Sequence, residues 1–411
     1  MILNKMKSLY TTLALVLIVL SGYAQTAHTI AQGAGYANDV FFSLENGIVG
    51  TAPTANWDLA FEVTSPFSIG IRVNDANGRD LAVYPNADIS GWDNIDTTGF
   101  AGWPKLYNRI DAWENGAFNT SPSGGPSDFS WGTYTGPPLF QVIGDSLYII
   151  TRPDDSALKL RLNNLDNGLW SFTYANLDGS NEVTTTINMD DHPDRNFIYY
   201  DFSTGIVDRE PASFAWDFVF TRYVGPTMYG LFPTTGVLLN TNRAAAMAED
   251  VDVTTVNHQN YTLTTDNIST VGNGWRVLDN FQWQIVSDLC YFVQSPAGDV
   301  YKIIFTNFTG ASTGITEFTT EIVSGASVNE AARLGAVAFP NPYTAGTLTL
   351  QGIEGTATVD VFALSGARVL TTQVNASGNR AELALDFLPA GAYLIQVQQN
   401  GQIETLRLVK N

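Results

Sequence analysis

The chain has 411 residues, and its 45% hydrophobic content is enough for two or three folded domains. Its formal net charge of −20 repels phosphate backbones, which excludes nucleic acid as a partner. A single cysteine, Cys290, excludes an intrachain disulfide and a multi-thiolate metal centre, and with only three histidines in the chain we assign no metal site.

The first 24 residues have the pattern of a secretory signal peptide. Lys5 and Lys7 precede an apolar run at 13–20, and Gly22 and Ala24 are small residues at the positions that a signal peptidase reads. No other stretch approaches the roughly 20 apolar residues that a transmembrane helix needs. We therefore expect residues 1–24 to be removed and the rest to be exported.

One pattern occurs twice in the middle of the chain. The segments VFFSL (40–44), GIV (47–49) and WDLAF (57–61) return as IYYDF (198–202), GIV (205–207) and WDFVF (216–220). Later in each unit, Tyr148 and KLRLNNL (159–165) correspond to Tyr291 and KIIFTNF (302–308). A period this long indicates two tandem domains, because the repeats of a solenoid are shorter. We place the two units at 35–189 and 196–324.

Both units alternate apolar and polar residues in short runs bounded by Gly, Pro, Asn and Asp, which is typical of strands. Strands are predicted at 147–151, 157–162 and 169–174 in the first unit, and at 289–294, 300–306 and 316–322 in the second. Residues 243–249 are the best candidate for a short turn of helix. The predicted fold is all-β, with two tandem antiparallel β domains followed by a small C-terminal β-sandwich.

The last module follows a linker at 325–338 and covers residues 339–411. Its sequence contains FPNP (339–342), VFALSG (361–366), LPAGAYL (388–394) and a terminal LVK (408–410). These motifs, in this order, resemble the type A C-terminal sorting domain of type IX secretion substrates. The resemblance assigns the sorting signal to the residues Phe339, Pro340, Asn341, Pro342, Gly391, Tyr393 and Lys410. It implies a protein of a Bacteroidetes bacterium that passes through the periplasm to the outer cell surface or the medium, with the type IX machinery and its sortase-like processing protease as partners.

The two repeated units resemble the HmuY-like family of secreted Bacteroidetes proteins. The resemblance depends on the opening strands, on WPKLYN (103–108) and GAFN (116–119) in the first unit, and on GVLLN (236–240) in the second. Characterised members of that family bind haem through paired axial ligands. Between Phe61 and Tyr148 the first unit has neither His nor Met, so it lacks the usual donors. If haem is bound, the available ligands are Met228, Met247 and His258; a Met in a β domain is more often part of the packing, and we assign no cofactor.

An aromatic-rich segment in the first unit is the other candidate site. Trp92, Trp103, Tyr107 and Trp113 lie among Gly, Asn, Asp and Ser residues. Exposed rings would form a platform for a polysaccharide or a porphyrin, whereas buried rings would pin a long insertion to the sheet. The second interpretation is favoured, because a segment without regular strands needs a small core of its own.

No catalytic residue is assigned. The segment GASTG (310–314) fits a nucleophile-elbow pattern, but no His follows His258 and strands flank the segment, which indicates a turn. We predict a non-catalytic binding or structural protein. The alternatives are a haem scavenger, expected to have a cleft beside Met228, Met247 or His258, and an extracellular hydrolase, expected to have a carboxylate pair in a groove.

Overall fold

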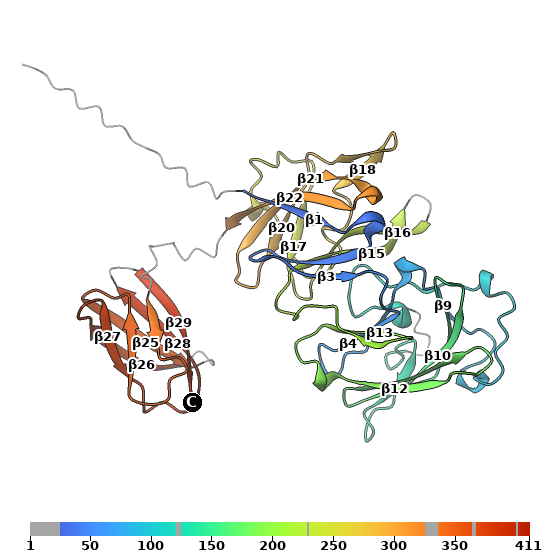
Figure 1. The fold of residues 1–411 in the computed structure, drawn as a ribbon, viewed down its shortest axis with the longest axis horizontal. Coiled ribbons are helices and arrows are strands. Elements are labelled where there is room, and N and C mark those ends of the chain that lie inside the picture. Colours follow the sequence, from blue (N-terminus) through green and yellow to red (C-terminus); the bar gives the residue numbers. More distant parts are fainter. Residues whose placement is uncertain (1–24, 121–124, 228–229, 325–335, 364–366, 400–401) are drawn as a thin grey trace, which may run out of the picture. The chain divides into compact units, whose positions relative to one another are not determined.

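Antiparallel strands and single turns of 3-10 helix make up the regular structure (Figure 1). The computed structural model describes residues 25–120, 125–227, 230–324, 336–363, 367–399 and 402–411. No helix in these ranges is long and apolar enough to cross a bilayer. The predicted signal peptide at 1–24 lies outside them. The chain divides into two units, Met1–Gly325 and Ala326–Asn411, and each is described by itself.

The first unit contains two β-sandwiches. In the first sandwich, one sheet has the order β12-β11-β10-β8-β7, with β9 paired to β10 and β6 to β9, and the facing sheet has the order β14-β13-β4-β5. Their bounds are β4 (Leu59–Glu62), β5 (Ile71–Val73), β6 (Leu81–Val83), β7 (Gly132–Tyr134), β8 (Val142–Gly144), β9 (Leu147–Thr151), β10 (Ala157–Asp166), β11 (Leu169–Asn176), β12 (Val183–Asn188), β13 (Phe197–Asp201) and β14 (Gly205–Val207). Phe61, Trp131, Trp170 and Phe172 are buried between the two sheets.

The second sandwich has sheets of order β1-β22-β21-β20-β17 and β16-β15-β2-β3, with a separate hairpin β18-β19. Their bounds are β1 (Thr26–Ala31), β2 (Asn38–Ser43), β3 (Gly47–Pro53), β15 (Phe218–Thr227), β16 (Gly230–Leu239), β17 (Ala245–Ala248), β18 (Arg276–Asp279), β19 (Gln282–Ile285), β20 (Cys290–Gln294), β21 (Val300–Phe308) and β22 (Ile315–Ser324). Phe42, Phe218, Tyr291 and Phe318 belong to its core. The predicted helical turn at 243–249 is wrong, because Ala245–Ala248 pairs with β20 as strand β17.

The connections contain eight single turns of 3-10 helix in the described residues. They are η1 (Ala34–Tyr36), η2 (Asp75–Asn77), η3 (Ile89–Gly91), η4 (Phe100–Gly102), η5 (Ala117–Asn119), η6 (Met189–Asp191), η7 (His258–Asn260) and η8 (Gly310–Ser312). The insertion of the first sandwich, between β6 and β7, is therefore held by short turns and by its own side chains.

The two sandwiches exchange hairpins. Strand β2, from the start of the chain, pairs with β15 in the second sandwich, while β13 pairs with β4 in the first. In Figure 1 the blue N-terminal hairpin accordingly lies beside β15. The predicted units 35–189 and 196–324 therefore do not coincide with the two sandwiches, because the hairpin that opens each unit completes the sheet of the other.

Equivalent aspartates hold the two exchanged hairpins. The Asp58 carboxylate accepts a hydrogen bond of 2.8 Å from the backbone N–H of Phe202, and Asp217 accepts one of 2.7 Å from the N–H of Leu44. Each aspartate is also paired with a buried or nearly buried arginine, Asp58 with Arg79 at 2.9 Å and Asp217 with Arg243 at 2.8 Å. The aspartate of each Trp-Asp pair thus fixes a hairpin from the other sequence unit.

A glycine in the first sandwich permits a close approach between strands. A Cβ atom at Gly144, in β8, would lie 1.7 Å from the carbonyl oxygen of Leu162 in β10. Real Cβ atoms do not approach a backbone oxygen so closely, so only glycine fits β8 beside β10 at this point.

The second unit, Ala326–Asn411, is a small β-sandwich. Its sheets have the orders β23-β24-β27 and β26-β25-β28-β29. The bounds are β23 (Val337–Phe339), β24 (Thr347–Gln351), β25 (Thr356–Ala363), β26 (Arg368–Asn375), β27 (Arg380–Ala384), β28 (Gly391–Gln399) and β29 (Gln402–Lys410). Tyr343, Leu348, Val359 and Ile395 lie in its core. The predicted all-β fold with a C-terminal sandwich is confirmed.

Candidate functional site

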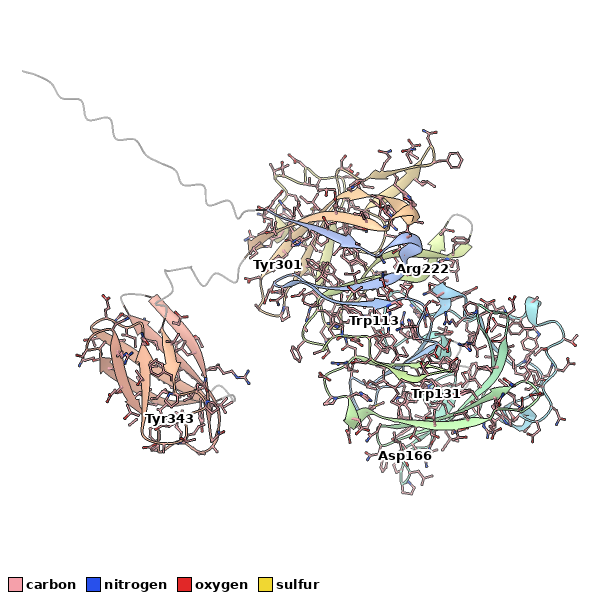
Figure 2. The ribbon with its side chains drawn as sticks, viewed as in Figure 1. Trp113, Trp131, Asp166, Arg222, Tyr301 and Tyr343 are labelled. Carbon is pink, nitrogen blue, oxygen red and sulfur yellow. The ribbon has the colours of Figure 1, made fainter. Side chains whose placement is uncertain are left out.

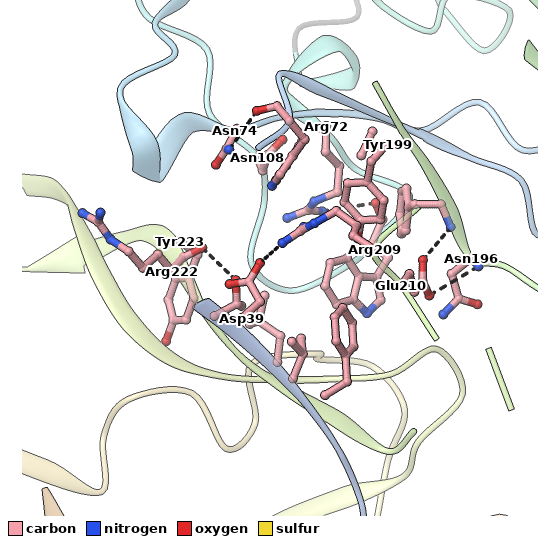
Figure 3. A pocket seen from close by; sticks show the side chains of 18 of the residues that line it. Asp39, Arg72, Asn74, Asn108, Asn196, Tyr199, Arg209, Glu210, Arg222 and Tyr223 are labelled. Carbon is pink, nitrogen blue, oxygen red and sulfur yellow. Dashed lines mark hydrogen bonds and ion pairs between the residues drawn. The ribbon is translucent and has the colours of Figure 1, made fainter. Parts of the chain in front are cut away.

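The junction between the two sandwiches contains a charged cavity of about 50 Å³ (Figure 3). Strands β2 and β15 line it from the second sandwich, and β4, β5 and β13 line it from the first. The exchanged hairpins place these strands side by side. Because a water molecule needs roughly 10–15 Å³, the cavity admits a few waters but no large ligand.

Arg209 is the central cation of this cavity. Its guanidinium forms a buried ion pair with Asp39 and donates a hydrogen bond of 3.1 Å to the carbonyl of Pro53. It also lies 4.6 Å from the ring centre of Tyr199 and 5.5 Å from that of Trp57. Arg209 therefore joins β2 of one sandwich to the β13 and β4 side of the other through charge and cation–π contacts.

Two buried carboxyl groups have perturbed pKa values here. Burial raises the pKa of Glu210 to about 7, although its carboxylate accepts hydrogen bonds from the N–H groups of Phe197 and Asn196. Burial also raises the pKa of Asp75 to about 6, although the hydrogen bond of 2.9 Å that Asp75 accepts from the N–H of Asn108 acts to lower this pKa. Both groups position backbone segments of the junction.

Trp57 and Trp216 occupy equivalent positions in the two sequence units and both line the cavity. Neither indole N–H has a hydrogen-bond partner among the described residues, and both nitrogens are buried. A buried donor without a partner is costly, and a water in the cavity is the natural acceptor at this size. The cavity is thus a small polar space at the structural junction, with two buried donors facing it.

A larger polar groove of about 620 Å³ adjoins the cavity, and the two share Trp113 and Asn196. Four carboxylates, one arginine, and several amide and hydroxyl groups line it; the charged members are Glu62, Asp111, Glu114, Asp266 and Arg195. Residues of both sandwiches contribute, so the groove depends on the hairpin exchange. Its excess of negative charge disfavours an anionic ligand.

Glu62 is the most buried carboxylate of the groove. Its two oxygens accept hydrogen bonds from the hydroxyl of Thr64 at 2.8 Å and from the N–H of Gly70 at 3.3 Å. Burial raises the pKa of Glu62, and the negative charge of Glu114 raises it further. Glu62 is held in place by Thr64 and Gly70, and both of its oxygens are engaged.

Trp113 is the one member of the predicted aromatic platform that lines the groove. Its indole N–H donates a hydrogen bond of 2.7 Å to the carbonyl of Leu239, and the Arg72 guanidinium lies over its ring, 4.9 Å from the ring centre. Figure 2 shows Trp113 at the junction of the two sandwiches. The ring is partly buried, so one part of it packs against its neighbours while another part lines the groove.

The other three predicted aromatic residues lie in the insertion of the first sandwich. Trp92 is buried, and its N–H donates a hydrogen bond of 2.8 Å to Glu182. Trp103 is partly buried against Tyr84, with ring centres 5.8 Å apart. Tyr107 is partly buried as well, and burial raises the pKa of its hydroxyl. Trp92 and Trp103 thus pack the insertion onto the sheet.

The proposed haem ligands do not converge in the described structure. Met228 lies outside the described residues. Met247 is 41% exposed and is opposite Tyr291 in the β17–β20 pairing, whereas the His258 ring lies 6.1 Å from Phe292. Neighbouring residues of a strand point to opposite faces, so Met247 and His258 are on different faces of the sheet. This arrangement does not support one iron bound by both.

The residues predicted to form the sorting signal gather around the terminal strand β29. The Asn341 amide donates to the carbonyl of Arg407 at 2.7 Å and accepts from the N–H of Val409 at 2.9 Å, and Lys410 Nζ lies 4.7 Å from the ring centre of Tyr343. Phe339 ends β23, and Pro340 and Pro342 flank Asn341.

Two more residues of the predicted signal lie in β28. Gly391 pairs with Lys410, and the Tyr393 hydroxyl donates a hydrogen bond of 2.8 Å to the carbonyl of Pro389.

The sequence reasoning missed Tyr343 and the groove carboxylates. Tyr343 is fully buried, and its hydroxyl donates to Asp386 at 2.6 Å. Tyr343 directly follows the FPNP motif at 339–342, and this position in the sequence was the feature that pointed to it. Glu62 extends the apolar run 59–61 of a strand, and such a charge at the end of a buried strand marks either an ion pair or a site.

Comparison with known proteins identifies the C-terminal module. Residues 337–411 match the family of secretion system C-terminal sorting domains. No curated protein matches the chain. The match confirms the prediction that the protein is a type IX secretion substrate, exported to the cell surface or the medium.

Two solved structures show a distant likeness. One is PorZ, an essential bacterial surface component of the type IX secretion system of Porphyromonas gingivalis, with 10% identity, 69% of this chain and 49% of that chain covered, and a TM-score of 0.17. The other is a polysaccharide lyase, with 10% identity, 96% and 47% covered, and a TM-score of 0.16. The chain spans about half the length of each, and at these TM-scores neither likeness carries an argument about function.

Proposed function

We propose that the exported protein is a non-catalytic binding protein that holds a neutral, hydroxyl-rich ligand, such as an oligosaccharide, in the polar groove. The observation that carries the proposal is the groove itself, about 620 Å³ in volume and lined by carboxylate, amide and hydroxyl groups beside one indole. This volume is typical of ligand pockets. Carboxylates and amides accept and donate hydrogen bonds to sugar hydroxyls, while an aromatic ring packs against a sugar face.

The state of Glu62 favours binding over hydrolysis. A general acid must have its proton free for the leaving group, but the two Glu62 oxygens are occupied by Thr64 and Gly70. Glu62 and Glu114 line the same groove, and this keeps hydrolysis as the second candidate, because a carboxylate pair in a groove is what a glycosidase requires. Release of reducing ends from a bound oligosaccharide is the readout that separates the two.

The tandem HmuY-like assignment is retained as part of the proposal. Its support is the equivalence of the two Trp-Asp pairs, since Asp58 and Asp217 make the same backbone contact to the hairpin of the other unit. Haem capture has no such support, because Met247 and His258 lie on different faces of a sheet.

The test is isothermal titration of the mature chain with gluco-, manno- and xylo-oligosaccharides. Replacing Glu114→Gln and Asp266→Asn together removes two exposed charged acceptors of the groove. A hydrogen bond to a charged group contributes about 1.5–3 kcal/mol, so at least a tenfold loss of affinity is expected. The matched control, Asp93→Asn with Asp154→Asn, removes two exposed charges that do not line the groove and should bind like the wild type.

An absence of binding to every neutral oligosaccharide, or an equal loss in the control variant, would contradict the proposed function. Tighter binding of oligogalacturonates than of neutral sugars would contradict the charge argument. If the wild type releases reducing ends and the Glu114→Gln variant does not, hydrolysis would replace binding as the proposed function.

A further inference from the structure

A second, chemically different pocket lies at the end of the first sandwich. Its volume is about 430 Å³, and it is built from the β4–β5 loop, the β7–β8 hairpin and the β10–β11 turn. Val142 and Leu165 are buried residues in its lining, with Ile69 and Phe129 partly buried beside them. Figure 2 shows Asp166, at the edge of this pocket, at the end of the sandwich. We call it the apolar pocket.

The rim of the apolar pocket consists of exposed apolar side chains. Phe67 is 88% exposed, Phe140 is 61% exposed and Leu139 is 59% exposed. Exposing this much apolar surface at one place is unfavourable in water, and contiguous exposed apolar surface around a hollow is typical of a binding site. Folding of the sandwich does not account for it, because these rings lie outside its core.

The backbone holds Phe140 in this position. Phe140 has a φ of 53°, in the left-handed region that bulky residues rarely adopt. The loop is closed by hydrogen bonds from the N–H of Phe140 to the carbonyl of Gly136 at 2.8 Å and from the N–H of Thr135 to the carbonyl of Gln141 at 2.9 Å. Such strain persists only when the surroundings fix it, and it concentrates at functional sites.

The second sandwich contains a comparable hairpin without this pocket. Hairpin β18–β19 follows the buried Trp275, as β7–β8 follows the buried Trp131, and at its tip Phe281 has a φ of 62° and is 94% exposed. There the Arg276 guanidinium lies 4.2 Å from the Trp275 ring centre. Phe281 therefore provides a matched comparison, because it has the same backbone region and the same ring but is not part of the apolar pocket.

The charge at the edge of the pocket selects among apolar ligands. Asp166 is the charged residue in its lining, and the chain as a whole has a net charge of −20. An anionic ligand is therefore repelled, whereas a donor nitrogen has an acceptor within the same site. The volume lies in the range of small-molecule pockets.

We propose that the apolar pocket binds a small aromatic amine, neutral or cationic, with its rings against Phe67 and Phe140 and its nitrogen toward Asp166. This site is separate from the polar groove and differs from it in the ligand it takes. The two proposals therefore succeed or fail independently.

The experiment titrates the mature chain with N-phenyl-1-naphthylamine, a neutral aromatic amine whose fluorescence increases in apolar surroundings. We expect saturable binding of one dye per chain. The variant Phe67→Ser with Phe140→Asn should weaken it at least tenfold. Asn tolerates a positive φ, so the loop keeps its conformation. Phe281→Asn, the matched control, should leave the affinity unchanged.

A second probe tests the charge argument. The anilinonaphthalene sulfonate dye has the same ring system with an added sulfonate, and it should bind at least tenfold more weakly than the neutral amine. Asp166→Asn should reduce that difference.

Three results would overturn the proposal: no saturable binding of the neutral dye, an equal loss in Phe281→Asn, or equal affinity for the sulfonate dye. If the double variant loses its near-ultraviolet circular dichroism, the single variant Phe67→Ser is used instead. Phe67 is 88% exposed, so its replacement leaves the core intact. The affinity of Phe67→Ser for the neutral dye should still be at least threefold weaker than that of the wild type.

Discussion

If the N-terminal part of the chain is produced alone, as residues 25–189, it should not form the first sandwich. The missing strand β13 pairs with β4 and contributes Ile198 and Tyr200 to the core, and Phe202 follows it directly. Burial of each such side chain stabilises a fold by about 1.5–3 kcal/mol, so their loss removes roughly 5–9 kcal/mol. The total stability of a domain is roughly 5–15 kcal/mol, so this loss removes a large part or all of it.

The assay compares three samples by near-ultraviolet circular dichroism, thermal unfolding and gel filtration. The fragment 25–189 alone should show no cooperative transition, whereas coexpression with 190–411 should give a 1:1 complex. The chain 25–324, with both sandwiches but without the sorting domain, is the control and should unfold cooperatively. A cooperative, native-like transition in 25–189 alone would refute the reasoning from hairpin exchange.

Three further predictions concern single residues. Burial raises the pKa of Glu210 from its ordinary 4.5 to about 7, so the folded state binds this proton more tightly than the unfolded state. The free energy of unfolding, measured by urea titration, should therefore fall by roughly 3 kcal/mol between pH 4.5 and 7. The variant Glu210→Gln should flatten that fall. Gly144→Ala should destabilise the first sandwich by roughly 3 kcal/mol in thermal unfolding, because the new Cβ would meet the Leu162 carbonyl. Tyr343→Phe should cost the sorting domain about 0.5–1.5 kcal/mol, measured by urea unfolding, because the buried tyrosine no longer donates a hydrogen bond to Asp386.

Each of these has a result that would contradict it. A Glu210→Gln variant with the pH profile of the wild type would show that another group titrates. A Gly144→Ala variant with unchanged melting temperature would mean that β8 and β10 separate without cost. For Tyr343→Phe, stability equal to the wild type would show that the hydroxyl contributes nothing to the sorting domain.

The strands themselves were largely predictable, because their alternation is local. Strand β9 has the predicted bounds 147–151, and β20 and β21 lie within one or two residues of the predicted 289–294 and 300–306. The failure at Ala245–Ala248 has a clear reason. Alanine favours helix when nothing else acts, but pairing with β20 decides the conformation here.

The hairpin exchange was not predictable from the pattern of either unit. Residues 40–44 and 198–202 have such similar patterns that each fits the sheet of either sandwich, so local sequence does not select the pairing. The groove was missed for a related reason, because its members Glu62, Glu114 and Asp266 come from distant loops and strand ends. Composition shows that acids are abundant but not which of them meet.

The hairpin exchange also sets the order in which the protein can acquire its structure during synthesis. The chain is synthesised from its N-terminus. Leu44 can bind its partner Asp217 only after 173 further residues have been made, and Asp58 can bind Phe202 only after 144. The N-terminal hairpin must therefore stay unpaired while most of the first sandwich is made. The first sandwich is complete only after β14 has been made in the second sequence unit, and the second sandwich, which needs β22, is completed last.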